Sequence, residues 1–158
     1  MKIYEAVKND FIISTDKSKL NIQFIHQYLC NESYWAKNIS VDTVKKSIAG
    51  SCCFGLYVYE HKNILTATQI GFARVITDHA TFAYLADVFV TEKFRGKGLA
   101  KWLMEVIMDH PELQGLRRWM PATRDAHNLY TKFGFTALDK PERIMGFKPF
   151  EVYPESDS

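Results

Sequence analysis

The stretch VFVTEKFRGKGLAK, residues 88–101, decides the fold. β-Branched and aromatic residues come first, Gly96 and Gly98 follow, and an amphipathic pattern begins at Leu99. This order predicts a strand, a glycine turn and a helix in succession. Glycine lets the backbone adopt positive φ and approach a ligand closely, and the first turn of a helix presents unpaired N–H groups. Such a turn favours phosphate binding.

The two elements that flank this turn are the best defined in the chain. Apolar residues recur at helical spacing after Gly98, and Pro111 ends the pattern. Residues 81–90, TFAYLADVFV, form the longest apolar β-prone run. A run of this kind predicts a central strand that is buried on both faces.

Further elements follow from the sequence on either side. A strand is predicted at 11–15, and a helix carrying apolar residues 20–29 is capped by Asp16 or Ser18. A second helix begins at Ser40 or Asp42 and ends at Gly50. A hairpin is predicted next, with strands at 53–59 and 69–76 joined by a turn at 60–63. After the central helix, the sequence predicts a strand at 116–122, a short helix at 126–133, and strands at 135–138 and 144–150. The order β, α, α, three antiparallel strands, α, β, α, β, β predicts one mixed α/β domain.

Length and charge restrict the class of protein. The chain has 158 residues, which fits a single domain. Lys and Arg number 20 against 18 Asp and Glu, so the net charge of +2 favours neither nucleic acid nor an acidic membrane as partner. Residues 1–5 lack the apolar core of a signal peptide, and Cys30, Cys52 and Cys53 lack metal-ligand spacing. We therefore expect a cytoplasmic protein without a metal.

Three types of phosphate loop are compatible with glycines between a strand and a helix. A Walker loop requires Gly-Lys-Ser/Thr, which does not occur here. A dinucleotide-binding loop requires a small residue where Lys101 stands, and a glycine almost directly after the strand, where residues 91–95 intervene. The third type is Arg-x-x-Gly-x-Ala, which Arg95–Ala100 matches with Phe94 before it.

A second motif lies downstream. Residues 123–135, TRDAHNLYTKFGF, are similar to Asn-x-x-Ala-x-x-Leu-Tyr-x-x-x-Gly-Phe, and one helix and one strand fit between the two motifs. Both motifs together resemble the GNAT family of N-acetyltransferases, strongly over residues 84–136 and weakly before residue 50, and in particular a branch of small bacterial enzymes. The resemblance implies a single GNAT-like domain over residues 1–150 with its motif core at 81–138. The domain would have a mixed, mostly antiparallel sheet, about four helices, and a flexible tail at 151–158.

The family resemblance also implies an activity. An acetyl group would move directly from acetyl-CoA, as co-substrate, to a primary amine of a small molecule or peptide. Tyr130 matches the usual proton donor for the departing thiolate, and Thr123 stands where an asparagine often contacts the pantetheine arm. The backbone of Val88, Phe89 and Val90 would bind that arm, and the pyrophosphate would lie on Arg95, Gly96, Lys97, Gly98, Leu99, Ala100 and Lys101.

The general base and the acceptor site are less defined. Arg118 occupies a position where some relatives carry a glutamate, so the base must lie elsewhere. Asp87 is the candidate, since an acidic residue in an apolar strand needs a partner or a role; an ion pair with Arg74 or Arg118 is the alternative. Tyr34 and Trp35, between the first two helices, either receive a cationic amine or cover the core.

Two alternative functions remain open at this point. The first is an acyl-CoA-binding or interaction module that keeps the fold without the chemistry. The second is a nicotinamide or flavin dinucleotide enzyme. Neither the acceptor nor the oligomeric state follows from the sequence, and a homodimer is one of the open states.

Overall fold

A six-stranded sheet forms the centre of the computed structural model, which describes residues 2–60 and 66–155. The strands are β1 (Glu5–Lys8), β2 (Phe11–Ser14), β3 (Cys52–Tyr59), β4 (Ala67–Thr77), β5 (Phe82–Val90) and β6 (Arg118–Pro121). They lie side by side in chain order. Every neighbouring pair is antiparallel except β5 and β6, which are parallel. The predicted mixed, mostly antiparallel sheet is confirmed.

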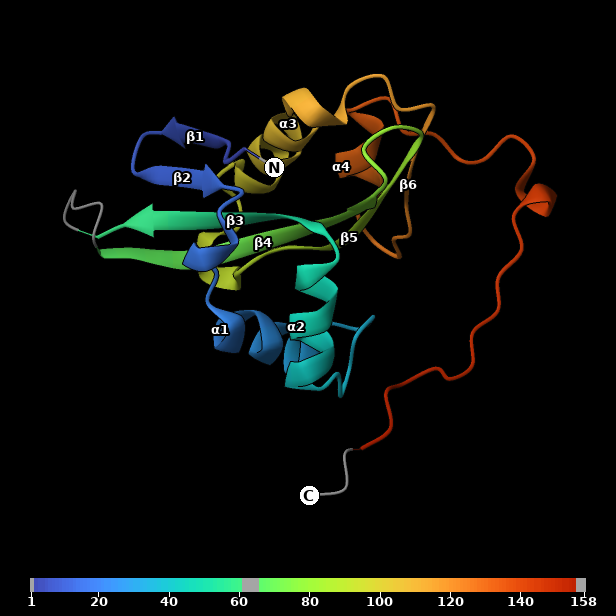
Figure 1. Cartoon of the computed structure of the whole chain (residues 1–158), viewed down its shortest axis with the longest axis horizontal. Helices are drawn as coiled ribbons and strands as arrows, with labels where there is room; N and C mark the ends of the chain where they lie inside the picture. The colour runs from blue at the N-terminus through green and yellow to red at the C-terminus, as the bar shows by residue number, and fades with distance from the viewer. Residues whose placement is uncertain (1, 61–65, 156–158) are drawn as a thin grey trace.

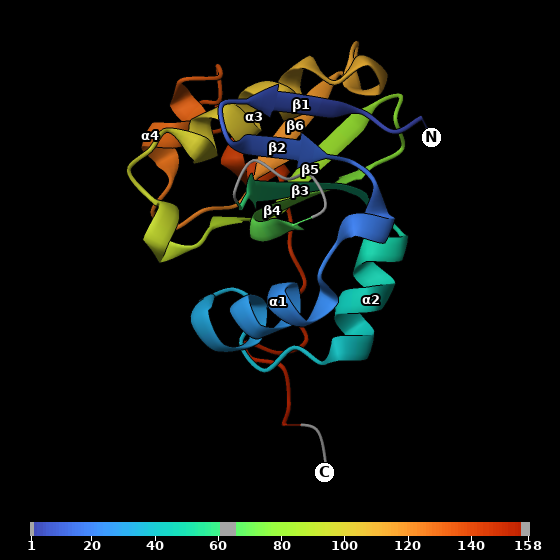
Figure 2. The same ribbon diagram turned by 90° about the vertical axis from the view of Figure 1, so that its left-hand side faces the viewer.

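Two helices cover each face of the sheet. Helices α1 (Ile22–Gln27) and α2 (Val41–Ala49) lie on one face, and α3 (Leu99–Asp109) and α4 (His127–Thr131) lie on the other (Figures 1 and 2). Each face has its own buried apolar cluster: Leu103 and Ile107 of α3 belong to the first, and Ile25 of α1 and Val44 of α2 to the second. The sheet is therefore the middle layer of a single α/β domain.

Polar caps fix where the N-terminal helices begin. Ser40 Oγ accepts a hydrogen bond from the Thr43 N–H at 3.1 Å, and α2 ends at Gly50, so these predicted bounds are confirmed. The predicted cap of the first helix is wrong. Asn21 caps α1, whereas Asp16 caps a separate 3-10 turn at Lys17–Lys19. The chain then leaves α1 through a π-helical turn, Tyr28–Glu32.

Three predictions for strands need correction. Strand β1 was not predicted, because its sequence EAVK lies at the exposed sheet edge and has no apolar run. Strand β5 is buried on both faces only in part, since Phe82 is exposed and residues 86–88 are half-buried. The turn predicted at 60–63 lies largely outside the described residues.

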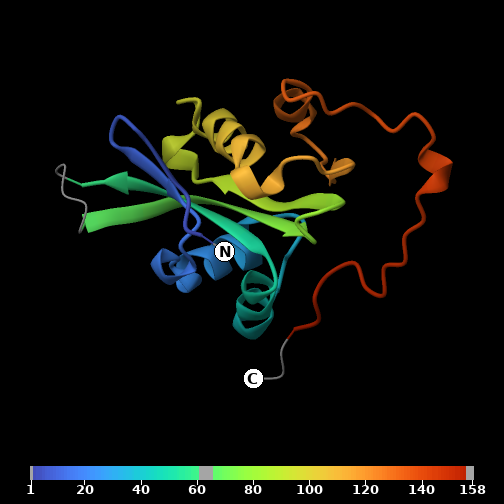
Figure 3. The same cartoon turned by 45° about the horizontal axis from the view of Figure 1, so that its top comes forward.

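The strands predicted at 135–138 and 144–150 are also wrong. These segments belong to an extended C-terminal arm, residues 136–155, which has one 3-10 turn at Pro141–Arg143 and no strand. Figures 1 and 3 show the arm leaving the body near α4 and returning below α2. β-Prone residues form a strand only beside a partner edge, and this arm has none in the described part of the chain. The last three residues of the predicted tail lie outside the described residues.

Strand β5 contains a bulge at its midpoint. Phe72 of β4 is opposite Phe89, but Arg74 is opposite Ala86, so two residues of β5 face one residue of β4. Asp87, the first of these two, has φ of 53°. An extra residue in one strand bends it and removes peptide groups from the ladder. The bulge therefore alters β5 directly before the glycine turn.

Candidate active site

Strands β5 and β6 diverge beside the bulge. Their pairing runs from Phe82 opposite Arg118 to Leu85 opposite Pro121, where β6 ends. Strand β5 continues to Val90, so the backbone of its last residues has no strand partner on the β6 side among the described residues. Unpaired peptide N–H and C=O groups bind an extended ligand in the manner of a strand. The predicted backbone site, Val88, Phe89 and Val90, lies at this opening.

The opening leads to the glycine turn. After a 3-10 turn at Glu92–Phe94, Gly96 has φ of 80° and Gly98 has φ of 75°, and α3 begins at the next residue. A Cβ at either glycine would meet no atom within 4 Å, so backbone conformation rather than crowding requires glycine. A hollow of about 180 Å3 lies at the N-terminus of α3 and is lined by Val90, residues 94–96 and residues 98–101. Its N–H groups and helix dipole favour an anion there.

Arg95 is exposed, but hydrogen bonds from its guanidinium hold the turn in place. Its Nε donates to the Val90 carbonyl at 3.0 Å, and its Nη2 donates to the Tyr28 hydroxyl at 3.0 Å. Tyr28 in turn stacks on Phe89, with ring centroids 3.7 Å apart. The side chains of Lys97 and Lys101 remain exposed. Lys97 Nζ lies 5.7 Å from the centroid of the Phe94 ring, so its charge stays beside the turn.

Asp87 lies at the centre of a polar network. Its Oδ2 accepts a hydrogen bond from Arg74 Nε at 2.8 Å, and its Oδ1 accepts one from Trp35 Nε1 at 2.9 Å. The Asp87 side chain is only 9% exposed. Arg74 Nη1 also donates to Ser51 Oγ. Of the two ion-pair partners considered from the sequence, the structure places Arg74 against Asp87.

The loop that carries Tyr34 and Trp35 spans the opening. Trp35 reaches Asp87 on β5, whereas the Tyr34 hydroxyl accepts a hydrogen bond from the Arg124 N–H at 2.8 Å. The Arg124 guanidinium lies 3.9 Å from the centroid of the Tyr34 ring. Both aromatic side chains remain exposed. This pair therefore links β5 to the segment before α4 and presents aromatic surface beside the opening.

Tyr130 lies on α4 at the wall of the larger cavity. This cavity, of about 720 Å3, is bounded by β6, α4 and residues 133–139. Tyr130 is 7% exposed, and burial raises the pKa of its hydroxyl to about 12, with smaller effects from Tyr34 and Asp125. The phenol therefore keeps its proton at neutral pH.

Thr123 has a local structural role. Its Oγ1 accepts hydrogen bonds from the Ala126 N–H at 2.9 Å and the Asp125 N–H at 3.3 Å. These bonds satisfy the N–H groups of the turn directly before α4, the helix that carries Tyr130. Thr123 also lines the larger cavity.

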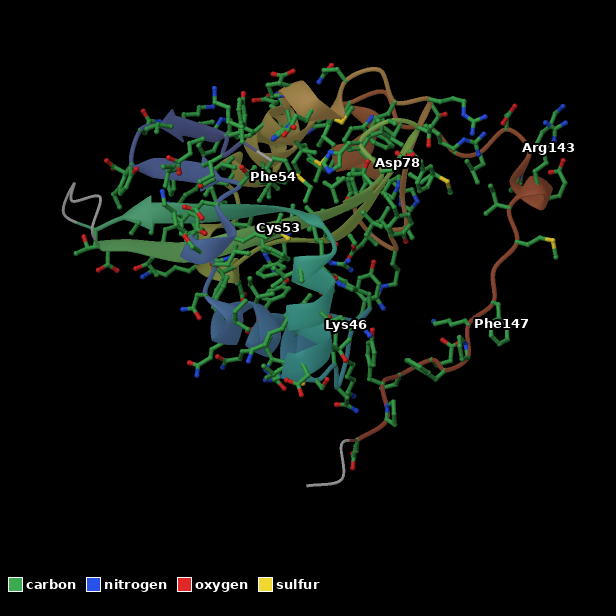
Figure 4. All side chains as sticks on the ribbon, in the orientation of Figure 1. Lys46, Cys53, Phe54, Asp78, Arg143 and Phe147 are labelled. Carbon is green, nitrogen blue, oxygen red and sulfur yellow. The ribbon has the colours of Figure 1, made fainter. Side chains whose placement is uncertain are left out.

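The buried cysteines have raised thiol pKa values. Burial raises the pKa of Cys52 to about 11 and that of Cys53, which lies on the α2 side of the sheet (Figure 4), to about 12. Both thiols are protonated at neutral pH. In residues 2–60 and 66–155, no group of three His, Cys, Asp or Glu side chains could hold a metal ion, and no helix is long and apolar enough to cross a membrane.

Comparisons with known proteins agree with this architecture. Residues 53–137 match the family described as Acetyltransferase (GNAT) domain. A Gibberella zeae protein described as a candidate acetyltransferase is 32% identical over 141 residues, covering 79% of this chain and 78% of that protein.

Two crystal structures are also similar. A candidate acetyltransferase of the GNAT family from Xanthomonas campestris pv. campestris has a TM-score of 0.79 and 46% identity, covering 87% of this chain and 92% of the other. A GNAT family acetyltransferase from Elizabethkingia anophelis with acetyl-CoA bound shares the fold, with a TM-score of 0.59 at 15% identity. The match covers 84% of this chain and 80% of the other.

Fold and site together define an α/β domain in which two diverging strands lead to a glycine turn at the N-terminus of a helix. The chain belongs to the GNAT acetyltransferase family. Its family and fold support acetyl transfer as the class of reaction.

The structure gathers the predicted site residues in two groups. The backbone of Val88–Val90 and the glycine turn are continuous along β5 and α3, whereas Thr123 and Tyr130 lie across the opening on the α4 side. The sequence did not reveal Trp35 as a partner of Asp87, or Tyr28 as a partner of Arg95. Their separations of 52 and 67 residues leave no local pattern to detect.

Proposed function

We propose that this chain transfers an acetyl group from acetyl-CoA directly to a primary amine of a small molecule or peptide. The observation that carries the proposal is the divergence of β5 and β6, which leads at one end to the N-terminus of α3 and has Tyr130 on its α4 side. The acetyl-CoA in the Elizabethkingia anophelis structure supports the choice of donor.

The glycine turn suits the pyrophosphate of coenzyme A. The first N–H groups of α3 point away from the helix, and Lys97 and Lys101 can neutralise the phosphate charges. The pantetheine arm, which carries amide groups, would pair with the backbone of Val88, Phe89 and Val90. The thioester then lies between β5 and α4.

The reaction requires a neutral amine, stabilisation of an oxyanion and a proton for the thiolate. Peptide N–H groups of β5 released by the bulge can donate to the oxyanion. Tyr130 holds its proton at neutral pH, because burial raises its pKa to about 12. A thiolate that forms beside this buried hydroxyl would also be destabilised by burial, so it would take a proton more readily than a thiolate in water.

Asp87 is the proposed base, acting through a water molecule, and Tyr34 and Trp35 are the proposed acceptor contacts. Each carboxylate oxygen of Asp87 accepts one hydrogen bond and keeps a further lone pair for a water. The aromatic faces beside it suit a cationic amine before it loses its proton.

The Tyr130→Phe variant tests the proposed chemistry. It should keep the increase in Tm caused by acetyl-CoA, because the phenyl ring still packs, and lose about 100-fold or more in turnover, because general acid catalysis is removed. Tyr59→Phe, at the end of β3, is the matched control. Acceptors are found by mass spectrometry with a panel of amines. Acetyl-CoA binding without CoA release over that panel would support a binding module instead.

A comparison of Asp87→Asn with Arg74→Met separates the two roles of Asp87. If the carboxylate is only half of an ion pair, both variants should reduce stability by about 3 kcal/mol and reduce turnover equally. We expect Asp87→Asn to reduce turnover at least tenfold more than Arg74→Met when both are assayed below their Tm. Equal losses would remove Asp87 from the base role.

A further inference from the structure

The loop of Tyr34 and Trp35 fixes an arginine beside the opening. The Tyr34 hydroxyl accepts a hydrogen bond from the Arg124 N–H at 2.8 Å, and the Arg124 guanidinium lies over the Tyr34 ring, 3.9 Å from its centroid. At this distance the guanidinium covers one face of the ring in a cation–π contact. That face of Tyr34 is therefore closed to a cationic amine, and Tyr34 holds the charge of Arg124 beside the opening instead.

The side chain of Arg124 keeps its hydrogen-bond donors free. Within residues 2–60 and 66–155 its guanidinium forms no ion pair and donates no hydrogen bond, whereas Arg74 is neutralised by Asp87 and also donates to Ser51. A guanidinium that lies over an aromatic ring can stack on it and leave the N–H groups at its edges free. Two parallel N–H groups bind a carboxylate or a phosphate side by side. Arg124 is thus prepared to receive an anion.

Arg124 also lies near both residues proposed to move protons. Burial is the main cause of the raised pKa of the Tyr130 hydroxyl, and Tyr34 is the next, so the Tyr34 and Tyr130 side chains lie close together. The Trp35 ring, whose centroid is 5.0 Å from that of Tyr34, donates to Asp87 Oδ1. The Tyr34–Trp35 pair therefore joins Arg124 on the α4 side of the opening to Asp87 on the β5 side.

The charges around the opening favour an acceptor that carries both signs. Asp87 and the exposed carboxylate of Asp125 attract an ammonium group, and Arg124 attracts an anionic group. We propose that the acceptor is a small molecule that carries a carboxylate or a phosphate besides its primary amine, that Arg124 binds this anionic group, and that Tyr34 positions Arg124. This inference rests on the proposed acetyl transfer and defines the chemical class of its acceptor.

Pairs of amines that differ only in the acid group test the proposal on the wild type. The carboxylate pair is β-alanine and its amide, and the phosphate pair is phosphoethanolamine and ethanolamine. We expect the kcat/KM of the acid member to exceed that of the neutral member on the order of 10- to 100-fold in at least one pair, as a charge-assisted contact predicts. The pair with the larger ratio distinguishes carboxylate from phosphate. Equal values within each pair would overturn the proposal.

Variants of Arg124 and Tyr34 assign the preference to these residues. Arg124→Gln removes the charge but stays polar, and it should reduce the acid-to-neutral ratio of kcat/KM to about 1, mainly through the KM of the acid member. Arg143→Gln is the matched control, because Arg143 lies on the C-terminal arm away from the two layers of the domain (Figure 4), and it should keep the wild-type ratio. Tyr34→Phe keeps the ring and should preserve more of the ratio than Tyr34→Leu. An unchanged ratio in Arg124→Gln would overturn the proposal.

Thermal shifts separate this inference from the proposed function, because they do not require turnover. With and without CoA, the acid member of a pair should raise the Tm of the wild type more than the neutral member does, and this difference should disappear in Arg124→Gln. If the difference is present but no amine is acetylated, the anion site stands and the proposed transfer fails. If amines are acetylated but no pair differs in kcat/KM or in Tm, the transfer stands and the anion site is overturned.

Discussion

In the proposed function, Gly98 lets a phosphate approach α3 closely. Its φ of 75° is costly for other residues, and a β-branched side chain there costs on the order of 1–2 kcal/mol. We expect Gly98→Val to abolish the increase in Tm that acetyl-CoA produces, because the turn must change shape. Gly115→Val is the control, since Gly115 has the same φ and equally open surroundings but lies in the loop before β6. If both variants keep the acetyl-CoA shift, the turn does not hold the pyrophosphate.

His110 makes stability depend on pH. It is buried between the rings of Tyr4 and Phe54, its Nδ1 accepts a hydrogen bond from the Glu112 N–H, and its Nε2 is buried without a partner in the described part of the chain. Burial lowers its pKa, the Glu112 carboxylate opposes this effect, and His79 adds to it.

The direction of the pH effect follows from this lowered pKa. Between the folded pKa and about 6.5, the unfolded chain binds the proton and the folded chain does not, so stability falls as pH decreases through this range. We expect the Tm to be lower at pH 5 than at pH 7.5. His110→Asn keeps an acceptor for the Glu112 N–H but does not titrate, and it should show a smaller decrease. An equal decrease in both proteins would assign the effect to other groups.

At the scale of elements, Thr123 stabilises the beginning of α4. Thr123→Ala removes the acceptor of two N–H groups and should cost about 1 kcal/mol, or roughly 2–4 °C in Tm. Thr123→Ser keeps the acceptor and should lose less than half as much. The measurement is thermal unfolding in the absence of ligand. Equal losses in the Ala and Ser variants would mean that the methyl group, not the hydroxyl acceptor, matters.

Elements with local signals could be predicted from the sequence. Helix α3 follows from its apolar spacing after Gly98, and α2 from Ser40 and Gly50. By contrast, the segment 144–150 has the composition of a strand without forming one, because a strand needs a partner edge and composition does not specify it. In the site, the glycine turn and Tyr130 lie in sequence motifs. The hydrogen bonds from Trp35 to Asp87 and from Arg95 to Tyr28 depend on tertiary packing, so no sequence motif predicts them.

At the scale of the whole molecule, two buried apolar clusters lie on opposite faces of one sheet, and β5 contributes residues to both.

The bulge at Asp87 determines on which face of the sheet each side chain of β5 lies. Ala83 and Leu85 lie in the α3 cluster, and beyond the bulge Val90 lies in that cluster while Phe89 lies in the α1–α2 cluster. Odd-numbered residues therefore face α3 before Asp87, and even-numbered residues face it afterwards, so the single extra residue acts as a frameshift in the alternation of the strand. Deletion of Asp87 would give β5 one uninterrupted alternation in which Phe89 still faces α1–α2, and it would remove the carboxylate that accepts hydrogen bonds from Arg74 and Trp35.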